Sequence, residues 1–140
     1  MKTPVMLKLT GRQTYLDQDP EIIELTTEGT IERDGDGWHI SYEESELTGL
    51  KGVTTSFFIQ PGKVTLSRNG ALQSQMHFEV GQYHHSLYQM EFGALQITVY
   101  ASQVDYSLDE KGGTLDLVYA IDIENTASGL IIYHLDVTAL

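Results

Sequence analysis

Apolar and polar residues alternate with a period of two along almost the whole chain, and turn signals interrupt the alternation at short intervals. In residues 23–31, Ile23 and Leu25 share one parity, and acidic or hydroxyl side chains hold the other. Pairs that favour turns, such as Pro61-Gly62 and Asn69-Gly70, separate neighbouring runs. Successive side chains of a strand point to opposite faces, so this pattern predicts half-buried β-strands. No stretch shows a convincing helical spacing.

The number of these runs and the regular spacing of the turns between them predict an all-β fold. A meander of this kind removes its exposed edges most simply by closing on itself. We therefore expect an antiparallel, up-and-down β-barrel of 8–10 strands that forms one domain over residues 1–140. A two-sheet sandwich is the alternative, but hairpin-length loops join consecutive candidates almost everywhere and favour the barrel. About ten strand candidates are present, in residues 5–10, 23–31, 38–44, 53–60, 63–68, 72–80, 83–92, 94–106, 115–123 and 131–137.

The amino-acid composition limits the classes of partner that such a barrel could bind. The formal net charge is −12 at pH 7, from 8 basic and 20 acidic residues. A surface this negative repels phosphate backbones and anionic lipids, so we expect neither nucleic-acid nor membrane binding. The chain has no cysteine, which removes disulfides and thiolate sites and fits a reducing compartment. With no segment of signal-peptide or membrane-spanning character, we expect a cytoplasmic protein.

The alternation also directs several polar side chains toward the apolar interior. In the run that starts at Trp38, the parity of Trp38 and Ile40 carries on through Tyr42 to Glu44, a carboxylate aimed at the core. Following the apolar face of every candidate strand gives the residues that we expect to bind a ligand: Arg68, Glu44, Tyr42, His84, Tyr88, Tyr119 and Tyr133.

Glu44 and Arg68 are the most informative pair in this set. One strand is expected between theirs, so their backbones would lie about 10 Å apart, a gap that two long side chains can span. An unpaired buried charge is costly, so the two groups should either meet or face solvent. In one interpretation they form a salt bridge that closes a filled barrel, or Arg68 stacks on a tyrosine at the end of the barrel. In the other, Arg68 holds the carboxylate or phosphate of a ligand with its bidentate fork.

Other chemistries find little support in the sequence. His84 and His85 are adjacent on a strand and point to opposite faces, so they cannot share a metal, and no convergent ligand set is apparent. Acidic clusters such as residues 34–37 are more typical of solvated turns than of calcium or acid–base sites. We expect no metal, no cofactor and no catalytic residues.

Short motifs recur along the chain in a characteristic order: Ser-Tyr-Glu-Glu at 41–44, Arg-Asn-Gly-Ala at 68–71, Met-x-Phe at 76–78, Phe-Gly-x-Leu at 92–95, Leu-Asp-Glu-Lys-Gly-Gly at 108–113 and Leu-x-Tyr at 117–119. In this order and spacing, over essentially the whole chain, the sequence resembles the YwiB-like proteins. They are an uncharacterised family of bacterial cytosolic proteins assigned to the lipocalin-like (calycin) β-barrels. The resemblance implies the barrel fold. It implies no catalytic residues, because the family has no established activity.

Three functional hypotheses follow. The first is a non-enzymatic barrel that binds one small, partly apolar or anionic ligand, with Arg68, Glu44 and the tyrosines at a polar end. The second is an interaction module with a filled barrel, in which the acidic exterior binds a protein or an apolar patch forms a homodimer. Outward apolar residues would mark such a patch: Phe58, Tyr100, Leu130 and Ile132. The third, ranked last, is a small-molecule enzyme.

Overall fold

Ten strands account for nearly all of the described chain. The computed structural model describes residues 2–15, 19–44, 52–70, 73–90, 93–124 and 127–140. Within these residues, no helix is long and apolar enough to cross a membrane. In chain order the strands are β1 (Thr3–Tyr15), β2 (Glu21–Asp34), β3 (Gly37–Glu43), β4 (Val53–Gln60), β5 (Lys63–Gly70), β6 (Gln73–Glu79), β7 (Tyr83–Met90), β8 (Gly93–Asp109), β9 (Gly112–Ile123) and β10 (Ala127–Ala139).

The strands form one closed barrel in which each strand pairs with its neighbours in sequence. The order around the barrel is β1-β10-β9-β8-β7-β6-β5-β4-β3-β2, and β1 closes the ring by pairing antiparallel with both β2 and β10. The prediction of an antiparallel up-and-down barrel is therefore confirmed, and the sandwich alternative is wrong. Because the barrel is closed, β1 and β10 each have a neighbouring strand on both sides. The ladder between them is long and runs from the Val5–Ala139 pair to the Tyr15–Gly129 pair.

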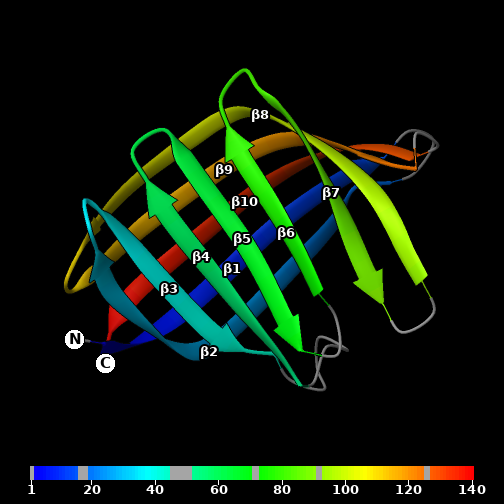
Figure 1. Ribbon diagram of the computed structural model, residues 1–140. Coiled ribbons are helices and arrows are strands. Elements are labelled where there is room, and N and C mark those ends of the chain that lie inside the picture. The colour runs from blue at the N-terminus through cyan, green and yellow to red at the C-terminus, as the bar shows by residue number, and fades with distance from the viewer. Residues whose placement is uncertain (1, 16–18, 45–51, 71–72, 91–92, 125–126) are drawn as a thin grey trace.

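Strand length divides the barrel into two walls (Figure 1). The front wall consists of the short strands β3 to β7, and the back wall consists of the long strands β8, β9, β10, β1 and β2. The two walls run across each other, which gives the barrel the strongly coiled form seen in Figure 1.

The seam between β6 and β7 is the weakest in this closed sheet. Its register contains two pairs, Gln73–Gln89 and Ser74–Tyr88, and the strands then separate. Past that point, Val80 forms a parallel bridge with Ala101 of β8. A register shift in β8 between Ala101 and Gln103 accompanies this change of partner. The start of β7 therefore pairs with β8 but not with β6.

One end of the barrel is filled by apolar side chains, nearly all of them aliphatic. This filled half lies toward the chain termini and the β2–β3 and β4–β5 turns, which gather at one end in Figure 1. Its side chains come from both walls, interlock in the lumen and are almost fully buried, as expected for inward positions of alternating strands. They are Val5, Leu7, Ile31, Trp38, Ile40, Ile59, Val64, Val99, Ala101, Leu115, Leu135 and Val137.

One local expectation needs correction. Asn69 and Gly70 do not form a two-residue turn, because both still pair with β4, opposite Thr54 and Val53. Gly29 lies at a close approach of two strands, where an added Cβ would lie 2.5 Å from the carbonyl oxygen of Ser41. β2 passes against β3 at this point, and only a residue without a side chain leaves room for it.

Candidate functional site

The half of the barrel opposite the filled half encloses a cavity of about 770 Å³. This hollow half spans the C-terminal part of β1, the N-terminal part of β2 and the facing parts of the other strands. Ile23, which is 44% exposed, lies on the lining and marks the edge of the opening. The back wall supplies most of the apolar lining, with Leu9, Ile23, Leu25, Leu95, Ile97, Leu117, Ile121, Ile123 and Ile131.

The front wall carries a line of polar side chains, and three of them, Tyr42, Arg68 and Tyr88, line the same cavity. The register places Tyr42 opposite Thr55, Thr55 opposite Arg68, Arg68 opposite Ser74, and Ser74 opposite Tyr88. Residues paired across a ladder share a face, so these five form one continuous inward row across β3 to β7. We call it the polar row. The neighbouring inward level on the filled side is apolar, with Ile40, Phe57, Leu66 and Met76.

Glu44 lies beyond the end of β3 and points inward, as the sequence pattern predicts. Its side chain lines the cavity, and the residue is only 8% exposed. The hydroxyl of Thr55 donates a hydrogen bond of 2.8 Å to its Oε1. Burial raises the pKa of Tyr42 far above 10.0, and the charge of Glu44 and a hydrogen bond to it raise it further. The carboxylate of Glu44 is thus stabilised by hydroxyl groups.

Arg68 is placed differently from Glu44. Its Nε is buried and has no hydrogen-bond partner within the part of the chain that the structure describes. The ion pairs of the described residues do not include one between Arg68 and Glu44. The expected intervening strand is present, since Thr55 of β4 lies between the two. The direct salt bridge of the first interpretation is not formed, and the lumen that it would have closed is hollow.

Tyrosines surround these two charged groups. Burial raises the pKa of Tyr133 well above 10.0, and its neighbours Tyr42, Tyr119 and Glu44 raise it further, while Arg68 opposes them. The ring of Tyr133 lies 5.9 Å from that of Phe57, and the ring of Tyr119 lies 4.5 Å from that of Phe78. Both tyrosines belong to the back wall, on β9 and β10, and line the cavity. With its raised pKa, Tyr133 keeps its proton and remains a neutral hydrogen-bonding group at neutral pH.

Six of the seven residues predicted from the sequence line the cavity, and His84 does not. The Nε2 of His84 lies 3.1 Å from Oε1 of Glu79, and its ring is 5.5 Å from that of His77. His77 alternates with the buried Met76 and Phe78 and therefore faces outward. β7 has separated from β6 at this level, so a side chain of β7 with inward parity no longer points into the lumen. The expectation that His84 faces the lumen is wrong for that reason.

Two members of the polar row, Thr55 and Ser74, were missed by the sequence reasoning. Thr55 is fully buried and Ser74 is 8% exposed. The signal for both was present: Thr55 has the parity of Val53 and Phe57, and Ser74 that of Met76 and Phe78. Small hydroxyl residues on an apolar face attract less attention than a charge does. Here they flank Arg68 on both sides.

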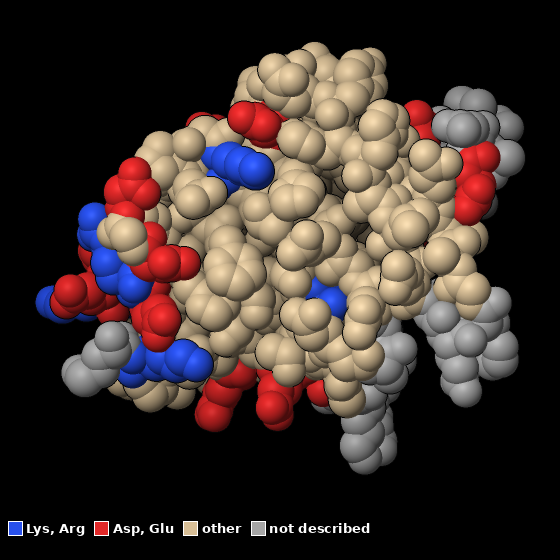
Figure 2. Space-filling view, in the orientation of Figure 1, with Lys and Arg blue, Asp and Glu red and all other residues tan. Residues whose placement is uncertain are grey.

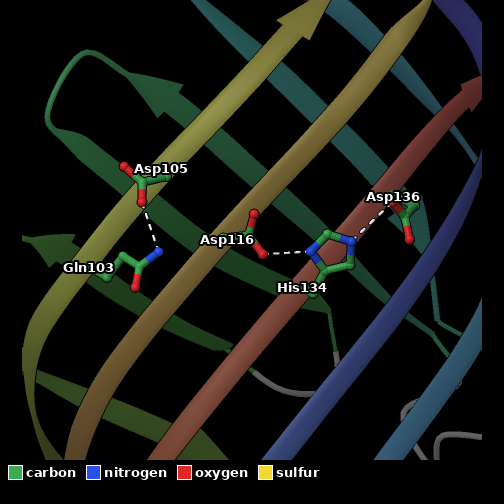
Figure 3. Close-up of polar contacts among 5 residues, drawn as sticks. All are labelled: Gln103, Asp105, Asp116, His134 and Asp136. Atoms are coloured by element: carbon green, nitrogen blue, oxygen red, sulfur yellow. Dashed lines mark hydrogen bonds and ion pairs between the residues drawn. The ribbon is translucent and has the colours of Figure 1, made fainter.

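Most of the titratable groups lie outside the lumen. On the outer face of β9 and β10, the ring of His134 lies between Asp116 and Asp136, with Nδ1–Oδ1 and Nε2–Oδ1 distances of 2.5 and 3.0 Å (Figure 3). The hydrogen bond to Asp116 raises the pKa of His134 above 6.5, and Asp136 adds to the effect. No group of three or more potential metal ligands converges among the residues with described positions.

The space-filling view shows how charge is distributed over one face (Figure 2). Asp and Glu gather mainly along the left and lower edges of this face, and most of the basic side chains lie at the left. The central surface is mostly uncharged. The strong negative charge of the chain is therefore unevenly spread over this face.

Comparison with known proteins gives a consistent picture of the fold. Residues 7–135 match a family model described as a domain of unknown function, DUF1934. The chain is 27% identical over 108 residues to the "Uncharacterized beta-barrel protein YwiB" of Bacillus subtilis (strain 168), covering 76% of this chain and 74% of that protein. The crystal structure of the ywiB protein from Bacillus subtilis superimposes with a TM-score of 0.82 at 24% identity, covering 96% of this chain and 92% of that one.

Proposed function

The chain belongs to the DUF1934 family, and we propose that its barrel binds one small, partly apolar molecule in the hollow half, without acting on it chemically. The observation that carries the proposal is the cavity of about 770 Å³, whose lining is mainly apolar with a few convergent polar groups. Cavities of roughly 300–1,000 Å³ with this mixture are typical of small-molecule sites. A barrel that only had to fold would gain stability by filling this space, because empty apolar volume costs packing energy.

The lining residues have distinct parts in this proposal. Arg68 anchors a polar group of the ligand, and Tyr88, Tyr119 and Tyr133 supply aromatic wall and hydroxyls. Glu44 and Tyr42 form the polar end beside Arg68. The aliphatic back wall holds the apolar part. Each assignment rests on the position of the residue on the cavity lining.

Native mass spectrometry of freshly purified protein and titration with the neutral fluorophore N-phenyl-1-naphthylamine test the proposal together. We expect a co-purified mass or saturable one-to-one binding of the fluorophore. Ile121→Trp, which fills the lumen, should abolish both signals. Ala120→Trp is the matched control, because Ala120 is the neighbouring outward residue and is exposed. Failure of the wild-type protein to bind, or equal binding by both variants, would rule the proposal out.

A second candidate function, a homodimer, is supported by an apolar stripe on the outer face of the sheet that runs across β7 to β10. The register aligns Leu130, Ala120, Tyr100 and Tyr83 across β10, β9, β8 and β7, with Ile132 on the adjoining row. Leu130 and Ile132 are each 46% exposed and Tyr83 is 69% exposed. A stripe without carboxylates is unusual in a chain of net charge −12 and suits contact with a second copy.

Multi-angle light scattering tests this second function. A dimer that Ile132→Lys converts to a monomer would support it. The sequence pattern includes Phe58 in this patch, but Phe58 lies on β4, away from the stripe, where it is half-buried and stacks on His39 with a centroid distance of 4.4 Å. Phe58→Lys is therefore the control that should leave the assembly unchanged. A wild-type monomer at all concentrations would exclude the homodimer.

A further inference from the structure

The two walls of the hollow half differ in chemistry, and this difference defines a class of ligand. The polar row crosses the front wall at one level, from Tyr42 of β3 to Tyr88 of β7. The facing back wall is lined mainly by aliphatic side chains. We propose that the ligand is an amphiphile with one singly charged oxyanion, seated on Arg68 at the centre of the polar row, and an apolar tail along the back wall. This inference rests on the proposed function.

The anionic head follows from the state of Arg68. Its buried Nε lacks a partner among the described residues, and the nearby carboxylate of Glu44 does not pair with it. A guanidinium presents its N–H donors in a rigid planar fork that matches two oxygens of one oxyanion. A ligand oxyanion would therefore satisfy a donor that the folded chain leaves open. The Ser74 hydroxyl, opposite Arg68 in the register, is the adjacent polar group on β6.

The charge of the head is limited to one by the other groups on the lining. Arg68 is the one Lys or Arg side chain among the described residues that line the cavity, whereas the carboxylates of Glu24 and Glu44 also line it. A doubly charged head would bring a second negative charge next to Glu44 without a cation to offset it. A cationic head is disfavoured as well, because Glu44 already accepts a hydrogen bond from Thr55 and lies beside Tyr42.

The position of the tail follows from the lining opposite the row. Ile97, Ile121 and Ile131, all buried, lie on three adjacent back strands and line the cavity. They offer continuous apolar surface that water would otherwise cover, and burial of a tail there is favourable in proportion to its area. A purely polar anion would leave this surface wet. The two walls together therefore select an amphiphile over an inorganic anion or a neutral hydrocarbon.

Three probes with the same tail and different heads test the inference: decanoate, decanol and decyltrimethylammonium. Each is titrated at neutral pH into wild-type protein loaded with N-phenyl-1-naphthylamine, and displacement is followed by fluorescence. We expect decanoate to bind at least tenfold more tightly than decanol, and decyltrimethylammonium to bind more weakly than either, because hydrogen bonds to charged groups are worth more than neutral ones. Inorganic phosphate should not displace the fluorophore.

Substitutions at positions 68 and 74 test whether the preference for decanoate over decanol depends on the guanidinium of Arg68. Arg68→Met should remove the preference of decanoate over decanol while the fluorophore still binds, and Arg68→Lys should keep part of it. Ser74→Val retains the guanidinium and covers the case in which the position 68 variants fail to fold; it should weaken decanoate severalfold and leave decanol unchanged. Equal binding of the three probes, or a preference for the cation, would overturn the inference and leave the proposed function standing. Absence of fluorophore binding would remove the proposed function itself.

Discussion

Replacing Arg68 with methionine separates a structural arginine from one held for a ligand, because the two roles predict opposite effects on stability. Methionine has a similar length and is apolar, so Arg68→Met removes the charge and the donors without opening a large void. If Arg68 held Glu44 in a buried salt bridge, its loss would leave an uncompensated carboxylate and cost about 3–5 kcal/mol. The structure does not contain that bridge.

The expected magnitude comes from the groups that Arg68 and Glu44 actually contact. Nε of Arg68 is a buried donor without a partner among the described residues, and leaving such a donor unsatisfied costs about 1–3 kcal/mol. Methionine removes this cost. Glu44 loses only a nearby positive charge, since its hydrogen bond from Thr55 stays in place. The free energy of unfolding of Arg68→Met should therefore lie within about 1 kcal/mol of the wild-type value or above it.

Urea unfolding followed by the fluorescence of Trp38 measures this difference. Trp38 is the single tryptophan, is 6% exposed and lies in the filled half. Thr55→Val provides the comparison. It removes the hydroxyl that donates to Glu44 and should lower the unfolding free energy by about 1.5–3 kcal/mol, as expected for a hydrogen bond to a charged group. A loss of 3 kcal/mol or more in Arg68→Met, with a smaller loss in Thr55→Val, would refute the argument.

Three further predictions follow from single sites. Gly29→Ala should lower the unfolding free energy by about 1–3 kcal/mol, because its Cβ would meet a backbone oxygen at 2.5 Å. Gly11→Ala, with its nearest contact at 3.9 Å, should be nearly neutral in the same assay. The raised pKa of His134 stabilises the folded state below pH 6.5, and this contribution disappears as pH rises through the raised value. His134→Gln should therefore be destabilising in mildly acidic buffer, by less than about 1 kcal/mol because the site is partly exposed to solvent, and neutral in alkaline buffer. Tyr42 and Tyr133 have pKa values raised above 10.0, so their ultraviolet ionisation signal should appear only when alkaline pH unfolds the chain.

Much of the fold follows from the alternation alone. Parity predicts both the strands and the face of each side chain, and the inward turn of Glu44 follows from Trp38 and Ile40 without any knowledge of the tertiary structure. Short loops predict the order of the strands, and the order predicts closure. The same reasoning places Arg68 on the lumen. These inferences depend only on local geometry, which the sequence determines directly.

Register and seams are harder to predict, because they depend on contacts between distant strands. Nothing near His84 in the sequence indicates that β7 leaves β6 after Ser74 and Tyr88, yet this separation takes the imidazole out of the lumen. Nor does any single strand reveal that Arg68 stands between Thr55 and Ser74. Parity gives the face of a residue, and only the pairing of strands gives its level in the barrel.

The division of the barrel into two halves explains how an unsatisfied arginine can persist. The filled half packs side chains such as Leu7, Ile40, Leu115 and Leu135, each fully buried, and its packing does not depend on the lumen at the other end. A local cost of about 1–3 kcal/mol at Arg68 is small beside the burial of such a core, although it is a large part of the net stability of a domain. The cost is removed only when something binds the guanidinium. Occupation of the hollow half by decanoate should therefore stabilise the whole barrel more than occupation by decanol does, and this difference should vanish in Arg68→Met.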